Sequence, residues 1–286
     1  MTHAISTDHT GGTDHASSTA YGISTYAYFW RFSTRAPRPM TLPEMLRDTA
    51  ELGGQVFQIC DYAPIESYDS AQLADVRAAA RDLGLALELG TRGVRPGHLL
   101  RYLDLAEQLD VTLVRSMLNT ADHRPDTTEA VSLLKEALPR YEDAGVTLGL
   151  ETYEQVSTDD LLTVVTGADS ERLGVVLDPG NSVARLERPA DVVAATAPYV
   201  VNIHVKDFAF TRRDGWVGFT YAGCPLGEGL LDHAAMIAAV GAARPGRDIN
   251  QIVEHWLPWQ DEGFDVTARL EHQWTQHSIN TLLRSE

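Results

Sequence analysis

Apolar and polar residues follow one recurring pattern from residue 21 to the C-terminal end of the chain. A short segment of alternating apolar and polar residues leads into a polar turn, and a segment with helical periodicity follows. Eight segments are predicted to be strands: 21–29, 54–60, 85–90, 112–118, 147–153, 173–178, 200–207 and 250–256. Helices are predicted after them, beginning near Pro43, Ser70, Pro96, Thr127, Thr158, Pro189, Asp232 and Val266.

Strict alternation of strands and helices predicts a parallel sheet. Eight such units over residues 21–286 match the size of a closed barrel, which needs about 250 residues. We therefore expect an α/β fold with a single domain, a (β/α)₈ TIM barrel over residues 21–286, preceded by a flexible tail over residues 1–20. A doubly wound open sheet is the alternative, but no GxGxxG motif follows any predicted strand.

The segment VVNIHVKD, residues 200–207, alternates between apolar and polar positions. In a barrel one face of each strand packs against the helices, and the other face points to the barrel centre. The apolar positions are expected to face the helices, so Asn202, His204 and Lys206 point inward. Because TIM barrels place their active sites at the C-terminal ends of the strands, His204 and Lys206 are candidate site residues.

The same alternation places Glu151, Asp178 and Glu254 at the inward ends of three further strands. A lone Glu or His at a strand end is usually structural, but four acidic or His residues on consecutive strands are harder to explain in that way. Three carboxylates and one imidazole suit Mn²⁺, Co²⁺, Mg²⁺ or Zn²⁺. We expect one divalent metal ion, with Mn²⁺ first among these, bound by Glu151, Asp178, His204 and Glu254.

Five segments, GLETYE, VVLDPGN, NIHVKD, PLGEGLLD and IVEHW, resemble sequence blocks of the xylose isomerase-like TIM barrel superfamily. This superfamily includes sugar phosphate isomerase/epimerase-type proteins, ketose 3-epimerases, inosose dehydratases and endonuclease IV of the AP endonuclease family 2 fold. In the ketose 3-epimerases a Glu, an Asp, a His and a Glu end strands five to eight and bind the metal, and the two glutamates move the proton. The resemblance implies that Glu151 and Glu254 are catalytic as well as metal-binding.

The chain departs from the epimerase pattern at several positions. Asn181 stands where the epimerases have a His, and Phe210 stands where they have an Arg. Ser157 replaces a substrate-binding Glu, and the HVKD segment is closer to the dehydratase and isomerase branches. Substrate contacts are expected from Lys206, Trp256, Glu154, Asn181 and Arg212, with Glu88 and Arg92 as weaker candidates, whereas His255 is expected to face the helices.

A metal ion with two nearby carboxylates predicts an isomerase or epimerase that removes the proton next to the carbonyl of a keto-sugar or related polyol. The alternative is a metal-dependent lyase or dehydratase that acts by β-elimination on an oxidised sugar, a 3-oxo-glycoside or an inosose. Weak activity on free ketoses is expected, because Asn181 and Phe210 replace two groups that the epimerases use. A non-catalytic sugar-binding subunit is the least favoured reading, because a binder needs no paired carboxylates on a metal.

The composition narrows the choice of partners. The chain has 23 Lys and Arg against 40 Asp and Glu, and the resulting net charge of −17 repels phosphate backbones, so no nucleic acid is expected to bind. Cys60 and Cys224 have no disulfide or zinc spacing, which fits a cytoplasmic protein. No apolar run approaches the roughly 20 residues that cross a bilayer, so no membrane is expected as a partner. The expected partner is a small sugar or cyclitol, and a homo-oligomer or a partner subunit stays open.

Overall fold

The computed structural model of the protein describes residues 19–284, so the tail expected over residues 1–20 lies almost wholly outside the described residues. Eight parallel strands form a closed barrel: β1 (Tyr21–Ser24), β2 (Val56–Cys60), β3 (Ala86–Gly90), β4 (Leu113–Ser116), β5 (Thr147–Glu151), β6 (Leu173–Leu177), β7 (Val200–Val205) and β10 (Gln251–Val253). They follow one another around the barrel in chain order, and β10 closes it against β1. The predicted (β/α)₈ barrel with a single domain is therefore confirmed.

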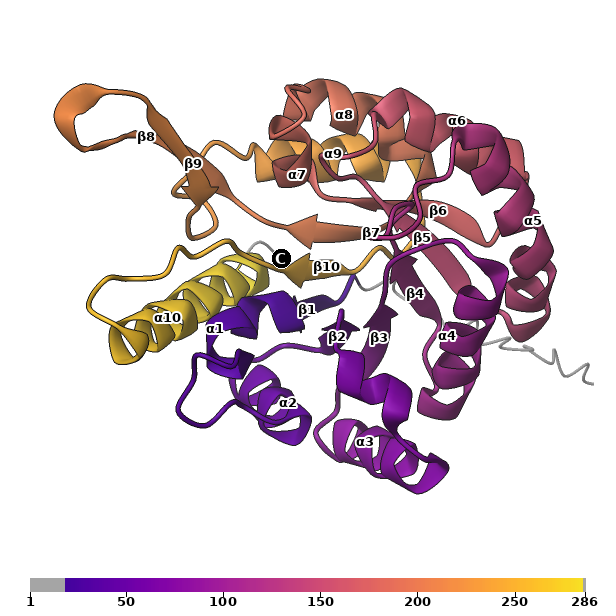
Figure 1. Ribbon diagram of the computed structural model, residues 1–286, viewed down its shortest axis with the longest axis horizontal. Helices are drawn as coiled ribbons and strands as arrows, with labels where there is room; N and C mark the ends of the chain where they lie inside the picture. The colour runs from indigo at the N-terminus through magenta and orange to yellow at the C-terminus, as the bar shows by residue number, and fades with distance from the viewer. Residues whose placement is uncertain (1–18, 285–286) are drawn as a thin grey trace, which may run out of the picture.

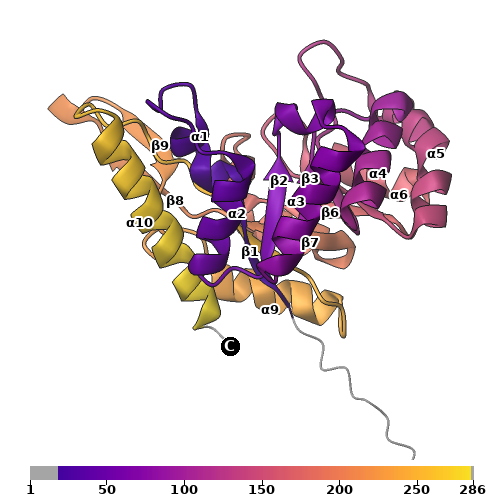
Figure 2. The ribbon, with the colours of Figure 1, turned by 90° about the horizontal axis from the view of Figure 1, so that it is seen from below.

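The helices surround the barrel on its outer side (Figures 1 and 2). They are α1 (Phe29–Phe32), α2 (Leu42–Glu51), α3 (Ser70–Asp82), α4 (Pro96–Leu109), α5 (Thr127–Ala144), α6 (Thr158–Ala168), α7 (Pro179–Val183), α8 (Pro189–Thr196), α9 (His233–Ala243) and α10 (Phe264–Leu283). Helices begin where the sequence signals them: α3 starts behind Asp69, whose carboxylate accepts a hydrogen bond from the Gln72 backbone N–H. Among the described residues, no helix combines the length and the apolar character that a membrane span requires.

Two segments differ from the sequence prediction at the C-terminal mouth of the barrel. The first strand ends at Ser24, and a short 3₁₀ helix (Thr25–Tyr28) replaces its expected second half. After β7 the chain forms an antiparallel hairpin of β8 (Phe208–Arg212) and β9 (Phe219–Gly223), in a segment where no strand was predicted from the sequence. The hairpin lies outside the barrel and projects from its mouth (Figure 1).

Asp207 fastens the base of this hairpin to the end of β7. Its carboxylate accepts backbone hydrogen bonds from Gly227, Gly229 and Leu231 at 2.9–3.0 Å. Its carbonyl oxygen accepts a further bond from the Cys224 backbone N–H, so the chain enters and leaves the hairpin at nearly the same point. The strand end that carries His204 and Lys206 is thereby held independently of the hairpin tip.

Candidate active site

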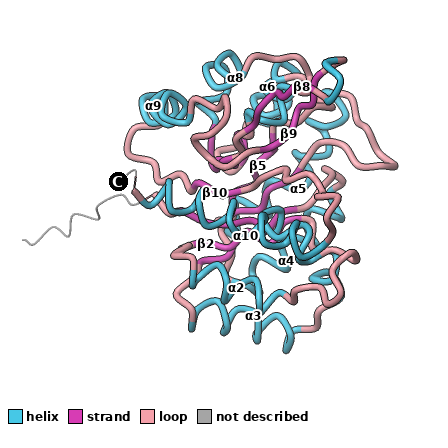
Figure 3. The backbone as a smooth tube through the Cα atoms, turned by 90° about the vertical axis from the view of Figure 1, so that its left-hand side faces the viewer, coloured by secondary structure: helices cyan, strands magenta, loops and turns pink. Residues whose placement is uncertain are grey.

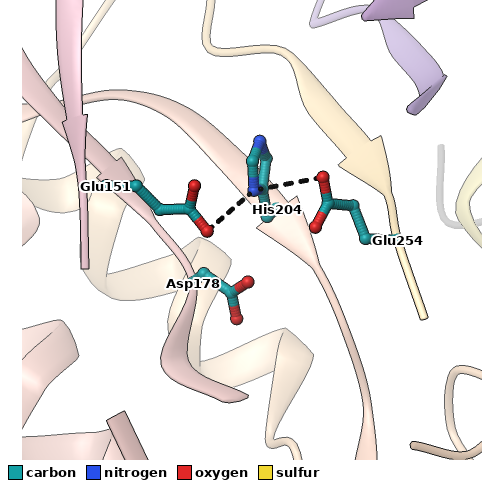
Figure 4. A group of neighbouring side chains, drawn as sticks. All are labelled: Glu151, Asp178, His204 and Glu254. Carbon is teal, nitrogen blue, oxygen red and sulfur yellow. Dashed lines mark ion pairs between the residues drawn. The ribbon is translucent and has the colours of Figure 1, made fainter. Parts of the chain in front are cut away.

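Four side chains predicted to bind a metal come together at the C-terminal mouth of the barrel. Glu151 ends β5, Asp178 follows β6, His204 lies in β7 and Glu254 follows β10. Each offers one ligand atom, and these atoms all lie within 4.8 Å of one another (Figure 4). All four residues are buried, so the carboxylates face each other with little help from solvent. The group could hold a divalent metal ion.

The hydrogen bonds around His204 show which of its nitrogens is available. The Gln58 amide nitrogen donates to Glu88 Oε2 at 3.0 Å, so the Gln58 amide oxygen faces His204 and accepts from its Nε2–H at 2.8 Å. In the neutral ring His204 Nδ1 therefore carries the lone pair, and it lies 3.4 Å from Glu151 Oε1 and 3.5 Å from Glu254 Oε1. Such a hydrogen bond on the far nitrogen is the usual support of a metal-binding histidine.

Two atoms of this group lack a hydrogen-bond partner among the described residues: His204 Nδ1 and Glu254 Oε1. Both are buried, and a buried polar atom without a partner is costly. Acceptors that converge on one point without a donor are stabilised by a cation between them. The residues present therefore fit a divalent metal ion.

Protons compete with a cation for the same group. Burial by itself would lower the pKa of His204, but the Glu254 and Glu151 carboxylates raise it. Burial raises the pKa of Asp178 to about 6, although the nearby Lys206 ammonium opposes the rise. A metal ion that binds here must therefore displace protons from at least one of these side chains.

Glu151 is held by partners on both of its carboxylate oxygens. Arg115, a buried residue of β4, forms an ion pair through Nε with Glu151 Oε2. The Asn181 side-chain amide donates to Glu151 Oε1 at 2.7 Å. Burial opposes ionisation, but Arg115 and His204 lower the pKa of Glu151 below its ordinary value. Glu151 is therefore an anion with little freedom to turn or to accept a proton.

Arg115 is itself fixed by the strand ends beside it. Its Nη1 donates to the Thr91 carbonyl at 2.9 Å and lies 3.5 Å from Asp61 Oδ2. Asp61 also accepts hydrogen bonds from Tyr26 Oη at 2.6 Å and from Arg92 Nε at 3.0 Å. Residues at the C-terminal ends of β1 to β4 thus form a network of hydrogen bonds and ion pairs, and this network ends at the Glu151 carboxylate.

Lys206 brings a buried positive charge to the other side of the group. Its Nζ lies 2.6 Å from Asp178 Oδ2 and 3.0 Å from Glu254 Oε2. It also lies 4.6 Å from the centre of the Trp256 ring, a cation–π contact. Burial by itself would lower the pKa of Lys206, but the Asp178 and Glu254 carboxylates raise it, so the ammonium stays charged.

A cavity of about 630 Å³ opens beside this lysine. Its wall is largely aromatic and includes Tyr26, Phe29, Trp30, Tyr221 and Trp256. The Trp256 ring lines the cavity and also contacts Lys206, so this side chain lies between the cavity and the metal-binding group. Aromatic walls suit the C–H faces of a sugar, and the adjoining charges suit its oxygen atoms.

The predicted substrate contacts lie at different distances from this cavity. Trp256 and Glu154 line it, and Lys206 adjoins it through the Trp256 ring. Asn181 is buried against Glu151. The structure does not bring Arg212 to the cavity; it lies on the exposed hairpin, with its guanidinium 5.2 Å from the Trp216 ring centre and 4.9 Å from that of Phe219.

The remaining residues, His255, Glu88 and Arg92, form hydrogen bonds with other side chains of the protein. His255 faces α10, where its Nε2 lies 3.0 Å from Thr275 Oγ1, as the strand alternation predicts. Glu88 accepts hydrogen bonds from the Gln58, Asn202 and Asn250 amides inside the barrel, and so supports His204 only through Gln58. Arg92 bonds to Asp61 and Tyr26 at the mouth.

Arg115 and Gln58 were not among the site residues predicted from the sequence, although a signal for both exists. Arg115 pairs in register with the inward-facing Gly149 of β5, and Gln58 pairs with Glu88 of β3. Each is a polar residue within a short apolar strand, so the alternation applied to the later strands would have turned both toward the barrel centre.

Comparisons with known proteins agree with this architecture. The family model described as "Xylose isomerase-like TIM barrel" matches residues 46–280. The chain is 56% identical over 264 residues to a protein of Pectobacterium atrosepticum named 3-oxo-isoapionate decarboxylase, covering 92% of this chain and 94% of that protein. Among solved structures, D-psicose 3-epimerase in the presence of D-fructose has a TM-score of 0.68 at 15% identity, with 93% of this chain and 98% of that one covered.

A second solved structure with this fold contains a metal ion. A xylose isomerase-like TIM barrel protein of Mycobacterium smegmatis in complex with magnesium has a TM-score of 0.66 at 18% identity, with 93% of this chain and 98% of that one covered. At such identities these two structures establish the shared fold alone.

Proposed function

Because the chain belongs to the xylose isomerase-like TIM barrel family, we propose that it is a metal-dependent decarboxylase of a 3-oxo sugar acid, 3-oxo-isoapionate or a close analogue. The chain is a sugar-processing enzyme of the isomerase, epimerase or lyase type, as the sequence predicts. Decarboxylation is a lyase reaction and differs from the β-elimination considered above in the bond that it breaks. The 56% identical relative carries that reaction in its name, and the site geometry supports it.

One observation carries the choice of reaction: the two glutamates are not equivalent. Both oxygens of Glu151 are engaged, by Arg115 and by Asn181, whereas Glu254 keeps one oxygen without a hydrogen-bond partner among the described residues. Epimerisation through two bases needs one carboxylate to take a proton and a second to return one on the opposite face. With Glu151 held as an anion, the site has one movable proton position, and decarboxylation needs no more than that.

The chemistry follows from the position of the ketone in such an acid. The bond between the carboxylate carbon and C2 breaks, CO₂ leaves, and the bonding electron pair forms an enolate across C2 and C3. A proton then returns to C2, and the C3 ketone forms again. A divalent ion held by Glu151, Asp178, His204 and Glu254 would supply electron withdrawal from the ketone oxygen.

The residues of the chain supply the other requirements. The Lys206 ammonium places a fixed positive charge beside the site, which stabilises negative charge that develops on the substrate. Lys206 Nζ lies 3.0 Å from Glu254 Oε2, so the ammonium stands beside this carboxylate and is placed to supply the proton that the enolate carbon takes up. The aromatic wall of the cavity offers few hydrogen-bonding groups to a carboxylate bound against it, and loss of hydration favours the release of CO₂.

We propose Mn²⁺ as the resident ion. Three carboxylates and one imidazole make an oxygen-rich set, whereas structural zinc sites favour sulfur and nitrogen ligands. Mg²⁺, Co²⁺ and Zn²⁺ are the alternatives. Elemental analysis after purification without added metal, followed by reloading of the stripped protein with each ion, distinguishes them.

The test is an assay of metal-loaded protein with 3-oxo-isoapionate in D₂O. We expect one equivalent of CO₂ per molecule of acid and one deuterium at the former C2 position, read by NMR. D-Psicose and D-fructose, which lack the carboxylate, are the matched controls, and they should show little exchange of their C–H protons. Faster exchange or epimerisation of these ketoses than release of CO₂ would assign the chain to the epimerases instead.

A further inference from the structure

The β8–β9 hairpin carries more exposed apolar surface than its position requires. Exposed fractions are 51% for Phe210, 77% for Trp216, 82% for Val217 and 62% for Phe219. These side chains lie within ten residues of one another on a two-stranded ribbon that projects from the barrel (Figure 1), and Figure 3 shows its strands β8 and β9 side by side. Isolated two-stranded ribbons are marginally stable in water, and clustered exposed aromatic residues mark interaction surfaces.

The charge of this hairpin is opposite to that of the chain. Arg212 and Arg213 outnumber its one acidic residue, Asp214, while the whole chain has a net charge of −17. The Arg212 guanidinium lies against the exposed Trp216 and Phe219 rings, which spreads positive charge over the apolar patch. A basic aromatic surface on an acidic protein is complementary to the acidic surface of another copy.

An acidic segment lies on the same side of the molecule. Asp261, Glu262 and Asp265 are exposed around the start of α10. Figures 1 and 2 both place the start of α10 and the hairpin on one side of the barrel. A basic patch and an acidic patch side by side form a self-complementary surface, because a two-fold axis brings each patch onto the opposite patch of the partner.

We propose that the β8–β9 hairpin is an arm that binds a second copy of this chain. In this two-fold dimer the arm of each copy lies on the acidic segment of the other, and the exposed aromatic side chains become buried. The aromatic cavity lies between these two patches, since Tyr221 and Ala222 line it from the hairpin and Pro258 lines it from the segment before α10. The second copy therefore covers the mouth of the cavity.

The first test measures the mass of the full chain in solution by sedimentation velocity and light scattering across a micromolar concentration series. We expect a dimer for the wild type and a monomer, half that mass, for the Trp216→Ser, Phe219→Ser double variant. Circular dichroism and thermal unfolding verify that this variant is folded. A wild type that stays monomeric throughout, or a folded variant that stays dimeric, overturns the proposal.

Charge reversal tests the pairing of the two patches. Arg213→Glu and Asp261→Arg should each weaken the dimer at least tenfold, and the two changes together in one chain should restore it, because the opposite charges meet again in the dimer. Arg140→Glu is the matched control, since Arg140 is an exposed arginine of α5, on the far side of the barrel in Figure 1, and should leave the mass unchanged. A dimer that neither single reversal weakens overturns the assignment of the surface, as does one that the double variant fails to restore.

Discussion

Glu151 and Glu254 lie at the two ends of the ligand group, and their surroundings differ. Glu151 faces the first half of the barrel mouth, where Arg115 and Asn181 occupy both of its oxygens. Glu254 faces Lys206 and leaves one oxygen without a hydrogen-bond partner among the described residues. Two glutamates, each at the C-terminal end of a barrel strand, thus have different hydrogen-bond and ion-pair partners, and we propose that their roles differ accordingly.

This difference bears on how one family supports several reactions. The metal-binding group alone is compatible with isomerisation, epimerisation and decarboxylation, because each passes through an enolate next to a carbonyl. We propose that the outcome depends on the number of side chains that can carry a proton to the substrate. Arg115, buried on a neighbouring strand and paired with Glu151, would remove one of them.

The strongest test of this comparison exchanges each glutamate for its amide. We expect Glu254→Gln to lower turnover by about 10³–10⁴-fold even at saturating metal, because the amide cannot carry the proton. Glu151→Gln should mainly weaken metal binding, and excess metal should restore most of its activity. Metal titrations of the decarboxylation rate for both variants measure the difference. Equal failure of both variants at saturating metal would contradict unequal roles.

The second test removes the arginine that distinguishes Glu151. Arg115→Met leaves a buried carboxylate unpaired, so we expect the free energy of unfolding to fall by about 3–5 kcal/mol. Urea unfolding of the metal-free protein measures this loss. Arg77→Ala, which removes the exposed ion pair with Asp110, is the control and should change stability by less than about 1 kcal/mol. A loss in Arg115→Met as small as that of the control would show that Arg115 does not hold Glu151.

The third test removes the positive charge beside Glu254. Lys206→Met should lower turnover by about 10²-fold, because it removes a preorganised charge from the developing enolate. The Michaelis constant should change less than turnover does, since the effect arises in the transition state. Steady-state kinetics of the metal-loaded variant measure both constants. A rise in the Michaelis constant alone would make Lys206 a substrate-binding residue only.

The smallest expected effect is that of pH on metal binding. The carboxylates raise the pKa of His204, so its protonated form stabilises the metal-free protein at low pH, and this stability is lost as pH rises through the raised pKa. Metal affinity should therefore rise with pH, by up to about tenfold per unit for each proton displaced. Calorimetric titrations at pH 6, 7 and 8 in buffers of different ionisation enthalpy count these protons. Affinity that is independent of pH would exclude a proton on the free site.

Much of the barrel could be predicted because each of its units is encoded locally. Helix starts at Pro96, Thr127 and Pro189 coincide with the predicted ones, since proline and capping residues act within a single turn. The ligand positions followed from strand alternation, which fixes the inward face once the fold is known to be a barrel. These inferences needed no knowledge of which strands are neighbours beyond their order in the chain.

Alternation could have turned Arg115 and Gln58 toward the barrel centre, but it could not show that they contact Glu151 and His204. Arg115 lies 36 residues before Glu151 and Gln58 lies 146 residues before His204, so each contact exists only once the barrel closes. The hairpin was missed for a different reason. Its aromatic residues alternate on both sides of a glycine turn, with Gly218 at a φ of 87°, but its arginines made the segment look like an ordinary polar loop.

The Asp207 carboxylate, which holds the loop after the hairpin by three backbone hydrogen bonds, has a consequence for the evolution of this barrel. A side chain at Gly229 would collide with that carboxylate and with the Phe208 carbonyl, so this closure depends on a glycine. Residues 208–223 form an insertion whose two ends are joined by the hydrogen bond between the Cys224 N–H and the Asp207 carbonyl. Selection can lengthen, shorten or re-surface the tip of this insertion without disturbing His204 or Lys206, whereas Tyr221 and Ala222 near its base belong to the cavity wall and tie that part to the chemistry.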